Sequence, residues 1–329
     1  MSNAKKTSII WNVTRLCSWT CKFCCVNAEF ISNLEQVNIN KDVNYCYKTE
    51  LSFSDKIKII DQLTHNKYTI DFSGGEILID PLNVELVLYA SKKLGADSVG
   101  ISTSGVFITD EVINKLSGNV RDVEITLDYL PFRPYKLRTV GYHEYAAYAI
   151  NRLITHGFTV GVQTVLTKEN ISKNIILEIF DWLEKNKVDS WSLLRFFPSG
   201  RGSKYNRLVP SYDEYCNIVE YISQLSKNSN LKVHFQYLLP NHSGYNEECR
   251  AVKKSIGILP DGSVTACFWA LDENMLPRDD IFYLGKLPQD NIDNILNSEK
   301  ANYWKNQKHH CKIFDFGSET ENLRVSTLK

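Results

Sequence analysis

Apolar and β-branched runs alternate with amphipathic stretches of helical length over the first 230 residues, and each run ends in small polar residues. The predicted strands are Ser8–Thr14, Tyr68–Gly74, Ser98–Ser104, Asp122–Asp128, Thr159–Thr167 and Ser190–Phe197. The predicted helices lie near Ser54–His65, Pro81–Leu94, Thr109–Leu116, His143–His156, Asn174–Lys185 and Tyr212–Ser226. This alternation predicts a parallel sheet with right-handed crossovers. Six strand–helix units are too few to close an ordinary eight-stranded barrel. A partial barrel and a doubly wound open sheet both fit this number of units.

The pattern changes after about residue 230. Lys232–Tyr237 has the pattern of a strand, and two further apolar runs, Ser255–Leu259 and Ser263–Cys267, flank a Pro-Asp-Gly turn that suits a tight hairpin. We therefore expect two domains, residues 1–230 and a smaller module over residues 231–329.

The composition excludes some classes of partner. The chain has 329 residues with 38 basic and 38 acidic side chains, and this balance disfavours a nucleic-acid partner. No apolar run reaches the roughly 18 residues of a membrane span, and no signal-peptide cleavage site is visible, so we expect a cytoplasmic protein without a membrane partner. The nine cysteines are an odd number and are clustered, which favours metal ligation over disulfides.

Four cysteines follow directly on the first predicted strand. Cys17, Cys21 and Cys24 therefore lie on a loop at the C-terminal end of that strand, where parallel α/β proteins carry out their chemistry. Three thiolates can hold three irons of a cubane cluster and leave the fourth iron open to another ligand. The alternative is a zinc knuckle with Cys25 as fourth ligand, although adjacent cysteines chelate one tetrahedral ion awkwardly.

The pattern C-x-x-x-C-x-aromatic-C, with Phe23 before the last cysteine, resembles the signature of the radical S-adenosylmethionine (SAM) superfamily. The resemblance implies a [4Fe-4S] cluster on Cys17, Cys21 and Cys24, with SAM bound at the open iron and Phe23 beside it. It also implies the α/β fold of a partial (β/α)6 TIM-like barrel.

Matches at the ends of other strands support this resemblance. Ser73-Gly74-Gly75-Glu76 is similar to the family's motif for the SAM amino group, because glycines let a backbone approach a ligand and a carboxylate accepts hydrogen bonds from an ammonium. Ser104 stands where the family often has Asn in a turn after strand three. Thr126-Leu127-Asp128 followed by Arg138 resembles the peptide- and sulfatase-modifying branch, in which Arg138 would pair with the SAM carboxylate; the alternative is a surface cation.

The segment from Arg195 to Gly202 also resembles that branch, and Arg195 is expected to face the site. The alternative is that the glycine and proline residues of this segment are ordinary loop residues. The cofactor-binding residues that the resemblance implies are Phe23, Ser73, Gly74, Gly75, Glu76, Ser104, Thr126, Arg138 and Arg195.

The C-terminal module resembles the SPASM/twitch extension, a cysteine-bounded hairpin and following helix that hold an auxiliary iron–sulfur cluster. Cys249, Cys267 and Cys311 carry the resemblance. Phe314 stands where the family commonly has a further cysteine, so we expect one auxiliary [4Fe-4S] cluster and not two. Its fourth ligand is left open among Asp315, His309, His310, Cys25, solvent and substrate. The alternative is a module that has lost its cluster and buries its cysteines as apolar residues.

The family resemblance implies an enzyme, a radical SAM oxidoreductase or maturase that cleaves SAM reductively to a 5′-deoxyadenosyl radical and takes a hydrogen atom from its substrate. An electron donor of flavodoxin or ferredoxin type is implied as partner. We expect the substrate to be a ribosomally synthesised peptide, modified by a cross-link, a thioether or an epimerised centre. The first strand starts near residue 8, so a leader-peptide recognition domain is expected on a separate protein. The alternatives are an aminocyclitol or sugar dehydrogenase that passes electrons to the auxiliary cluster, and a non-catalytic metal-cluster scaffold.

Overall fold

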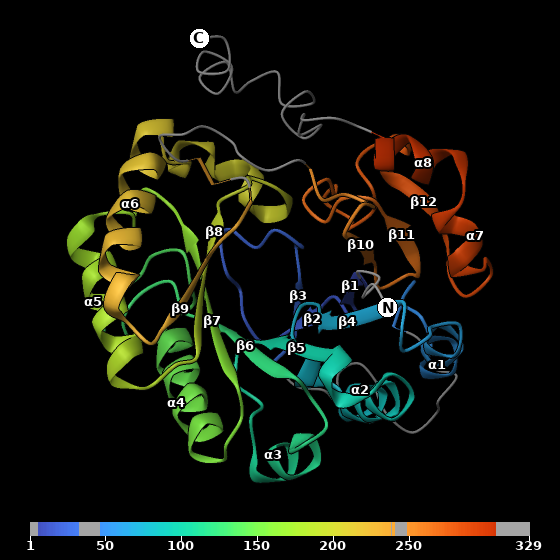
Figure 1. The fold of residues 1–329 in the computed structure, drawn as a ribbon, viewed down its shortest axis with the longest axis horizontal. Coiled ribbons are helices and arrows are strands. Elements are labelled where there is room, and N and C mark those ends of the chain that lie inside the picture. Colours follow the sequence, from blue (N-terminus) through green and yellow to red (C-terminus); the bar gives the residue numbers. More distant parts are fainter. Residues whose placement is uncertain (1–5, 33–46, 238, 241–248, 307–329) are drawn as a thin grey trace.

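The computed structural model describes residues 6–32, 47–237, 239–240 and 249–306 of the chain. Helices surround one large sheet in these residues (Figure 1). The strands are β1 Thr7–Asn12, β2 Leu16–Cys17, β3 Glu29–Phe30, β4 Tyr68–Ser73, β5 Val99–Thr103, β6 Asp122–Thr126, β7 Val160–Leu166, β8 Ser190–Arg195, β9 Lys232–Phe235, β10 Ser255–Ile258, β11 Ser263–Thr265 and β12 Tyr283–Lys286. The α-helices are α1 Phe53–Asp61, α2 Pro81–Leu94, α3 Asp110–Leu116, α4 Tyr142–Thr155, α5 Lys173–Lys185, α6 Tyr212–Leu225, α7 Ile292–Leu296 and α8 Glu299–Asn306.

The sheet is an open, partial barrel, which confirms the predicted fold. Its strand order is β12-β11-β10-β1-β4-β5-β6-β7-β8-β9, and the strands from β10 to β9 pair in parallel. The described part of the sheet ends at β9 on one side and at β12 on the other. The six predicted strands and six predicted helices of the first 230 residues all form, within a few residues of their expected ends.

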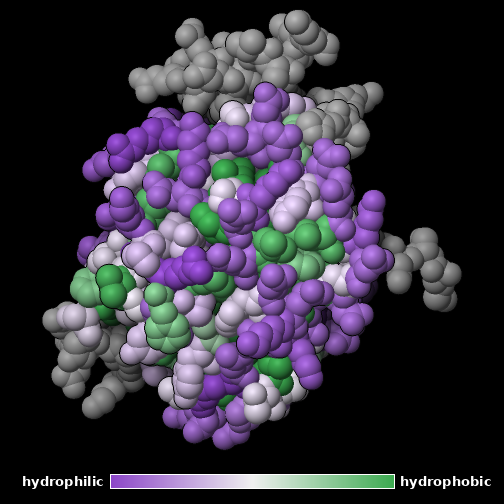
Figure 2. Space-filling view, turned by 90° about the vertical axis from the view of Figure 1, so that its left-hand side faces the viewer, coloured by the Kyte–Doolittle hydropathy of each residue, from purple (hydrophilic) through white to green (hydrophobic). Residues whose placement is uncertain are grey.

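Local signals explain where helices begin and end. The Asp80 side chain accepts a hydrogen bond from the backbone N–H of Leu82 and caps α2, and Pro81 occupies its first turn. The helix ends before Gly95, whose φ of +85° favours glycine. In α5 the buried side chains recur at helical spacing, from Ile176 to Leu183. Figure 2 looks onto the side that carries α5 and shows mainly hydrophilic side chains there.

The two faces of the barrel sheet differ in polarity. Ile9 and Trp11 of β1 are fully buried in the main apolar core, as are the alternate residues Ile70 and Phe72 of β4. Most of the intervening positions of these and the next strands are polar, although Ile10 is apolar. The polar ones line a cavity; they are Ser8, Asn12, Asp71, Ser73, Ser102, Glu124, Thr126 and Gln163. A closed eight-stranded barrel fills its interior with packed branched side chains, whereas this open one leaves a polar interior for a ligand.

The C-terminal strands extend both edges of the barrel sheet. The predicted hairpin is confirmed: β10 and β11 pair antiparallel, with Gly257 opposite Thr265, and Gly262 has a φ of +87° in the turn. β10 also pairs in parallel with β1. The strand expected within the separate module, β9, pairs instead with β8 at the other edge, which corrects its assignment. The proposed division of the chain at residue 230 stays a prediction.

Among the described residues, no helix combines the length and apolar character that crossing a membrane requires.

Candidate active site

A cavity of about 540 Å³ opens between the cysteine loop, the inner face of the barrel and the C-terminal segment. This volume is within the usual range of ligand sites. Most predicted site residues lie on its wall, namely Cys17, Cys21, Phe23, Cys24, Ser73, Gly74, Gly75, Ser104, Thr126, Arg138, Arg195 and Cys267. Residues from distant parts of the chain therefore meet at one place.

The three N-terminal cysteines carry free thiols. Cys17 and Cys21 are buried and Cys24 is partly buried, and the loop that bears them is closed by the pairing of β2 with β3. In the described part of the chain, no three His, Cys, Asp or Glu side chains gather closely enough to hold one metal ion. Three separate thiols facing one cavity fit a multi-iron cluster, in which each thiol ligates a different iron.

The protein environment favours the protonated thiol at Cys17 and Cys25. Burial, and next the charge of Glu76, raises the pKa of the Cys17 thiol well above its usual value. Burial, and next the neighbouring Cys24, raises the pKa of Cys25 to about 12. A metal at these sulfurs reverses this preference, because a coordinating thiol is deprotonated.

Gly74 and Gly75 allow the end of β4 to pack directly against the start of the cysteine loop. A Cβ atom at Gly75 would overlap the carbonyl oxygen of Leu16 and lie 2.7 Å from that of Arg15. A Cβ at Gly74 would lie 2.7 Å from the Thr14 carbonyl oxygen. The N–H of Gly75 donates to that same oxygen at 2.8 Å. Only glycine fits this approach, so the motif positions the loop in addition to lining the cavity.

Glu76 does not lie on the cavity wall, in contrast to the expected contact of its carboxylate with an ammonium group. The residue is 1% exposed, and its carboxylate accepts hydrogen bonds from Thr103 Oγ1 at 2.6 Å, from the Ser104 N–H at 2.8 Å and from the Ser104 hydroxyl. The indole of Trp19 donates to the Ser104 Oγ at 2.9 Å. Glu76 therefore positions the end of β5, and the backbone of Gly74 and Gly75 faces the cavity in its place.

Arg138 reaches the cysteine loop from the segment between β6 and α4. Its guanidinium pairs with Asp128 at 2.6 Å and lies 3.4 Å from the Cys21 Sγ. The rings of Phe23 and Tyr142 stack against it, each with its centroid 4.5 Å away. Burial, the largest single influence, lowers the pKa of Arg138, but the Asp128 carboxylate together with Tyr142 and Cys21 outweighs burial and raises that pKa above its usual value. A permanent cation is thus fixed beside the thiols.

Arg195 and Arg201 enclose the site from the end of β8. Arg195 is 2% exposed, and the Tyr215 ring centroid lies 5.2 Å from its guanidinium. Arg201 donates through Nε to the Cys21 carbonyl oxygen at 3.0 Å and through its backbone N–H to that of Cys24 at 3.0 Å. Its Nη1 donates to the Ala28 carbonyl oxygen. Sequence reasoning did not assign this role to Arg201, and the only signal was its place in the Ser-Gly-Arg-Gly segment.

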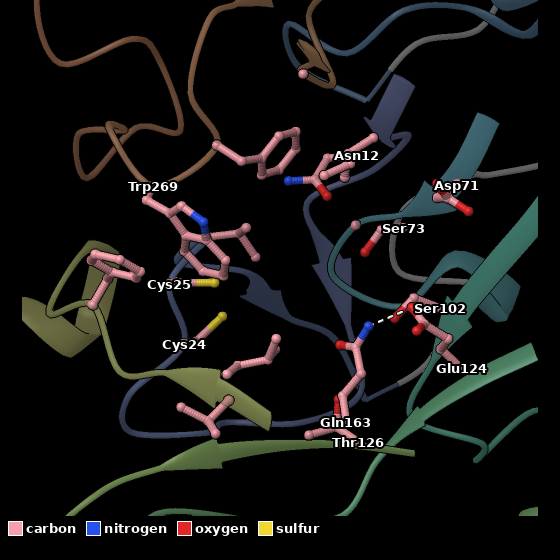
Figure 3. Close-up of a pocket in the computed structure, with 18 of the residues that line it drawn as sticks. Asn12, Cys24, Cys25, Asp71, Ser73, Ser102, Glu124, Thr126, Gln163 and Trp269 are labelled. Carbon is pink, nitrogen blue, oxygen red and sulfur yellow. Dashed lines mark hydrogen bonds between the residues drawn. The ribbon is translucent and has the colours of Figure 1, made fainter. Parts of the chain in front are cut away.

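The C-terminal segment contributes aromatic side chains and one cysteine to the cavity. Cys267 and Trp269 line it, and Trp269 stacks on Phe197 with ring centroids 5.2 Å apart. Figure 3 shows the sulfurs of Cys24 and Cys25 on the same side of the cavity as Trp269. Cys249 packs against the main apolar core and does not line the cavity. The other predicted auxiliary-cluster residues, Cys311, His309, His310 and Asp315, lie outside the described residues.

A partial α/β barrel with three free thiols at the C-terminal end of its first strand defines a class of enzyme that uses an iron–sulfur cluster. The model of the Radical SAM superfamily matches residues 11–183, just over half of the chain, and a model described as an iron-sulfur cluster-binding domain, SPASM, matches residues 249–313. The chain belongs to the radical SAM superfamily and has a SPASM domain. Membership implies a [4Fe-4S] cluster and SAM, and the SPASM domain implies an auxiliary iron–sulfur cluster.

Individual relatives differ in their substrates. The chain is 30% identical over 229 residues to the Fe-coproporphyrin III synthase of Methanosarcina barkeri; the match covers 69% of this chain but spans only about half, 53%, of that protein. Streptococcus suis SuiB bound to its precursor peptide SuiA shares the fold with a TM-score of 0.70 at 15% identity, over 92% of this chain and 67% of SuiB. The structure of anSMEcpe with AdoMet and the Cp18Cys peptide has a TM-score of 0.62 at 15% identity, and the match covers 93% of this chain and 86% of anSMEcpe.

Proposed function

We propose that this protein cleaves SAM reductively and uses the resulting radical to modify a ribosomally synthesised peptide, with a cross-link, a thioether or an epimerised centre as product. The observation that carries the proposal is one cavity that joins the three cysteine thiols, the partly buried cation Arg138 and the polar interior of the barrel. An electron donor of flavodoxin or ferredoxin type and a cytoplasmic location belong to the same proposal, because the chemistry needs a low-potential electron and reduced thiols.

Each group of residues has a role in this proposal. Cys17, Cys21 and Cys24 hold the cluster, and the auxiliary cluster takes Cys249, Cys267 and Cys311. When bound there, the cluster would supply the electron for the reductive cleavage of SAM to methionine and a 5′-deoxyadenosyl radical, and the radical would abstract a hydrogen atom from the substrate.

The remaining wall residues position SAM and exclude water. In this proposal Arg138 pairs with the SAM carboxylate, and the backbone of Gly74 and Gly75 receives its ammonium group. The further polar wall groups Ser73, Ser104, Thr126 and Arg195 complete the cofactor site. Trp269 and Phe197 stack on each other, and both line the cavity. In this proposal they help to keep water from a reactive radical.

The size of the cavity supports a peptide substrate. Its volume of about 540 Å³ includes the space that SAM and the cluster must occupy, so only a side chain or a similar small group can also enter. A peptide can present one residue to such a site while the rest of the chain stays outside. SuiB bound to the precursor peptide SuiA and anSMEcpe with the Cp18Cys peptide share this fold, which supports a peptide as substrate.

The likeness to the Fe-coproporphyrin III synthase favours a second candidate, an iron-porphyrin substrate. Arg195, Arg201 and Arg250 line the cavity and suit the binding of carboxylate groups. A macrocycle would have to bind largely at the cavity mouth, because the interior volume is small.

Anaerobic incubation of the iron-reconstituted protein with SAM and dithionite tests the radical chemistry. The wild type and the control Cys216→Ala, which lies in α6 outside the cavity, should release 5′-deoxyadenosine, and Cys21→Ala should release none. Release by Cys21→Ala would contradict the mechanism. No release by a wild type with full iron content would favour the non-catalytic scaffold.

The substrate is tested by adding candidates to the same mixture. A short precursor peptide encoded beside the gene should change mass and increase 5′-deoxyadenosine formation, as followed by mass spectrometry. Conversion of an iron-coproporphyrin or an aminocyclitol in place of the peptide would overturn the peptide assignment while leaving the radical chemistry intact.

A further inference from the structure

The cavity wall also carries polar and acidic side chains that lie outside the cysteine loop. Glu124 of β6, Gln163 of β7, Asp71 of β4 and Asn12 of β1 all lie on its wall (Figure 3). Glu124 lies on the inner face of its strand, two residues before Thr126, so it is one layer deeper in the barrel. No role in binding the cluster or SAM uses these four side chains.

Glu124 differs from its acidic neighbours in making no direct ion pair among the described residues. Asp71 pairs with Arg121 and accepts a hydrogen bond from the Ser8 hydroxyl at 3.1 Å. Asp122 pairs with the same Arg121 at 2.9 Å. Glu124 instead accepts one hydrogen bond, from the side-chain amide of Gln163, drawn as the dashed line in Figure 3. Arg121 thus pairs directly with two carboxylates and reaches Glu124 only by a weaker charge interaction.

This arrangement disfavours a negative charge on Glu124. Burial, and then the charges of Asp71 and Asp122, raises its pKa to about 7. A carboxylate in such a place is stabilised when a cation with hydrogen-bond donors enters beside it. Lys254 also lines the cavity, at the foot of β10, but it is exposed and no ion pair joins it to Glu124 within the described ranges.

Asn12 is an independent indication that this wall binds a ligand. The residue is 1% exposed, and its side-chain nitrogen Nδ2 has no hydrogen-bond partner in the part of the chain that the structure describes. Buried polar groups in proteins are rarely left without partners. A ligand that offers an acceptor, such as a carbonyl oxygen, would satisfy it.

We propose that Glu124, Gln163 and Asn12 form a substrate subsite that binds a basic side chain, the ammonium of a lysine or the guanidinium of an arginine in the substrate peptide. Glu124 accepts hydrogen bonds from the cation, and Asn12 donates to a carbonyl oxygen of the same residue. The subsite rests on the proposed peptide function and adds its specificity: the residue presented to the radical is anchored by its positive charge.

Equilibrium binding to the anaerobically reconstituted protein with SAM tests the subsite at pH 8. The probes are N-acetyl-lysine amide and the uncharged, similarly shaped N-acetyl-norleucine amide. The wild type should bind the lysine probe at least about tenfold more tightly, and Glu124→Gln should lose this preference. The control Glu178→Gln, a surface position on α5 paired with Arg133, should keep it.

Equal affinity of the wild type for the two probes would overturn the subsite, whether or not the variants fold. Retention of the preference by a folded Glu124→Gln would overturn it as well. The same preparations are assayed for 5′-deoxyadenosine release without substrate, which reports on the radical chemistry alone. A failure of the proposed function therefore appears as absent release, and a failure of the subsite appears as absent lysine preference.

Discussion

Arg201 donates a hydrogen bond from its Nε to the carbonyl oxygen of Cys21 at 3.0 Å, although 180 residues separate the two in sequence. Gly200 makes this contact feasible, because its φ is +53° and a Cβ there would lie 2.5 Å from the Cys25 carbonyl oxygen. The Ser199–Gly202 segment thus holds the backbone of the cysteine loop, and the spacing of the thiols depends on it.

Replacement of Arg201 by lysine should loosen the cysteine loop. Lysine keeps the positive charge but cannot donate from the guanidinium positions to the carbonyl oxygens of both Cys21 and Ala28. Loss of a charged hydrogen bond costs about 1.5–3 kcal/mol. We expect Arg201→Lys to lose iron faster than the wild type on exposure to a chelator, as measured by absorbance. The control Arg207→Lys, at an exposed position six residues further along the chain, should lose iron at the rate of the wild type. Equal iron loss by both variants would contradict this role.

Asp128→Asn should destabilise the protein through Arg138. The carboxylate of Asp128 is fully buried and pairs with Arg138 at 2.6 Å, so its removal leaves an uncompensated cation beside Cys21. Breaking such a buried pair from one side costs about 3–5 kcal/mol. Urea unfolding should show this loss of unfolding free energy, whereas Asp110→Asn, which removes an exposed partner of Arg152, should change it by less than about 1 kcal/mol.

Gly75→Ala should displace the start of the cysteine loop. The added Cβ would overlap the carbonyl oxygen of Leu16, and neither backbone segment can move without breaking the hydrogen bond from Glu76 N–H to that oxygen at 2.8 Å. We expect no measurable 5′-deoxyadenosine release. Gly118→Ala, at a turn with open space around it, is the control and should retain release despite about 1–2 kcal/mol of backbone strain. Full activity of Gly75→Ala would show that the loop adapts.

Glu124 should make the protein more stable at mildly acidic pH. Its pKa is raised from 4.5 to about 7, so between these values the native state binds a proton that the unfolded chain does not. This contribution, at most about 3 kcal/mol, is present below pH 4.5 and is lost as the pH rises through 7.

Urea unfolding of the wild type and Glu124→Gln at pH 5.5 and pH 8 measures this effect. The unfolding free energy of the wild type, relative to that of Glu124→Gln, should be higher at pH 5.5 than at pH 8. His143, whose pKa burial lowers to about 4, acts in the opposite direction but equally in both proteins. A pH-independent difference would contradict the raised pKa of Glu124.

Cys267→Ala should remove only the auxiliary cluster. The wild type, anaerobically reconstituted, should contain about eight irons per chain, as two cubanes require, and the variant about four. Uncoupled 5′-deoxyadenosine release should persist in the variant, because the N-terminal thiols are intact. A wild type with about four irons would show that the C-terminal module binds no cluster.

Local sequence patterns were sufficient for the secondary structure and for the main chemistry. Apolar residues occur at every second position in β4 and at helical spacing in α5. These patterns involve only a few neighbouring residues, so the strands and helices of the barrel could be predicted. The cysteine spacing and the hairpin turn at Gly262 are equally local, since one short segment carries each signal.

Contacts between distant segments were decided only by the tertiary structure. The pairing of β9 with β8, the burial of Glu76 beneath Ser104 and the contact of Arg201 with Cys21 depend on partners that no local pattern specifies. The same holds for Glu124, whose neighbours in space come from other strands. Hydrophobic periodicity shows which face of a strand is buried, but the charge and hydrogen bonding of a buried group depend on the side chains that folding brings beside it.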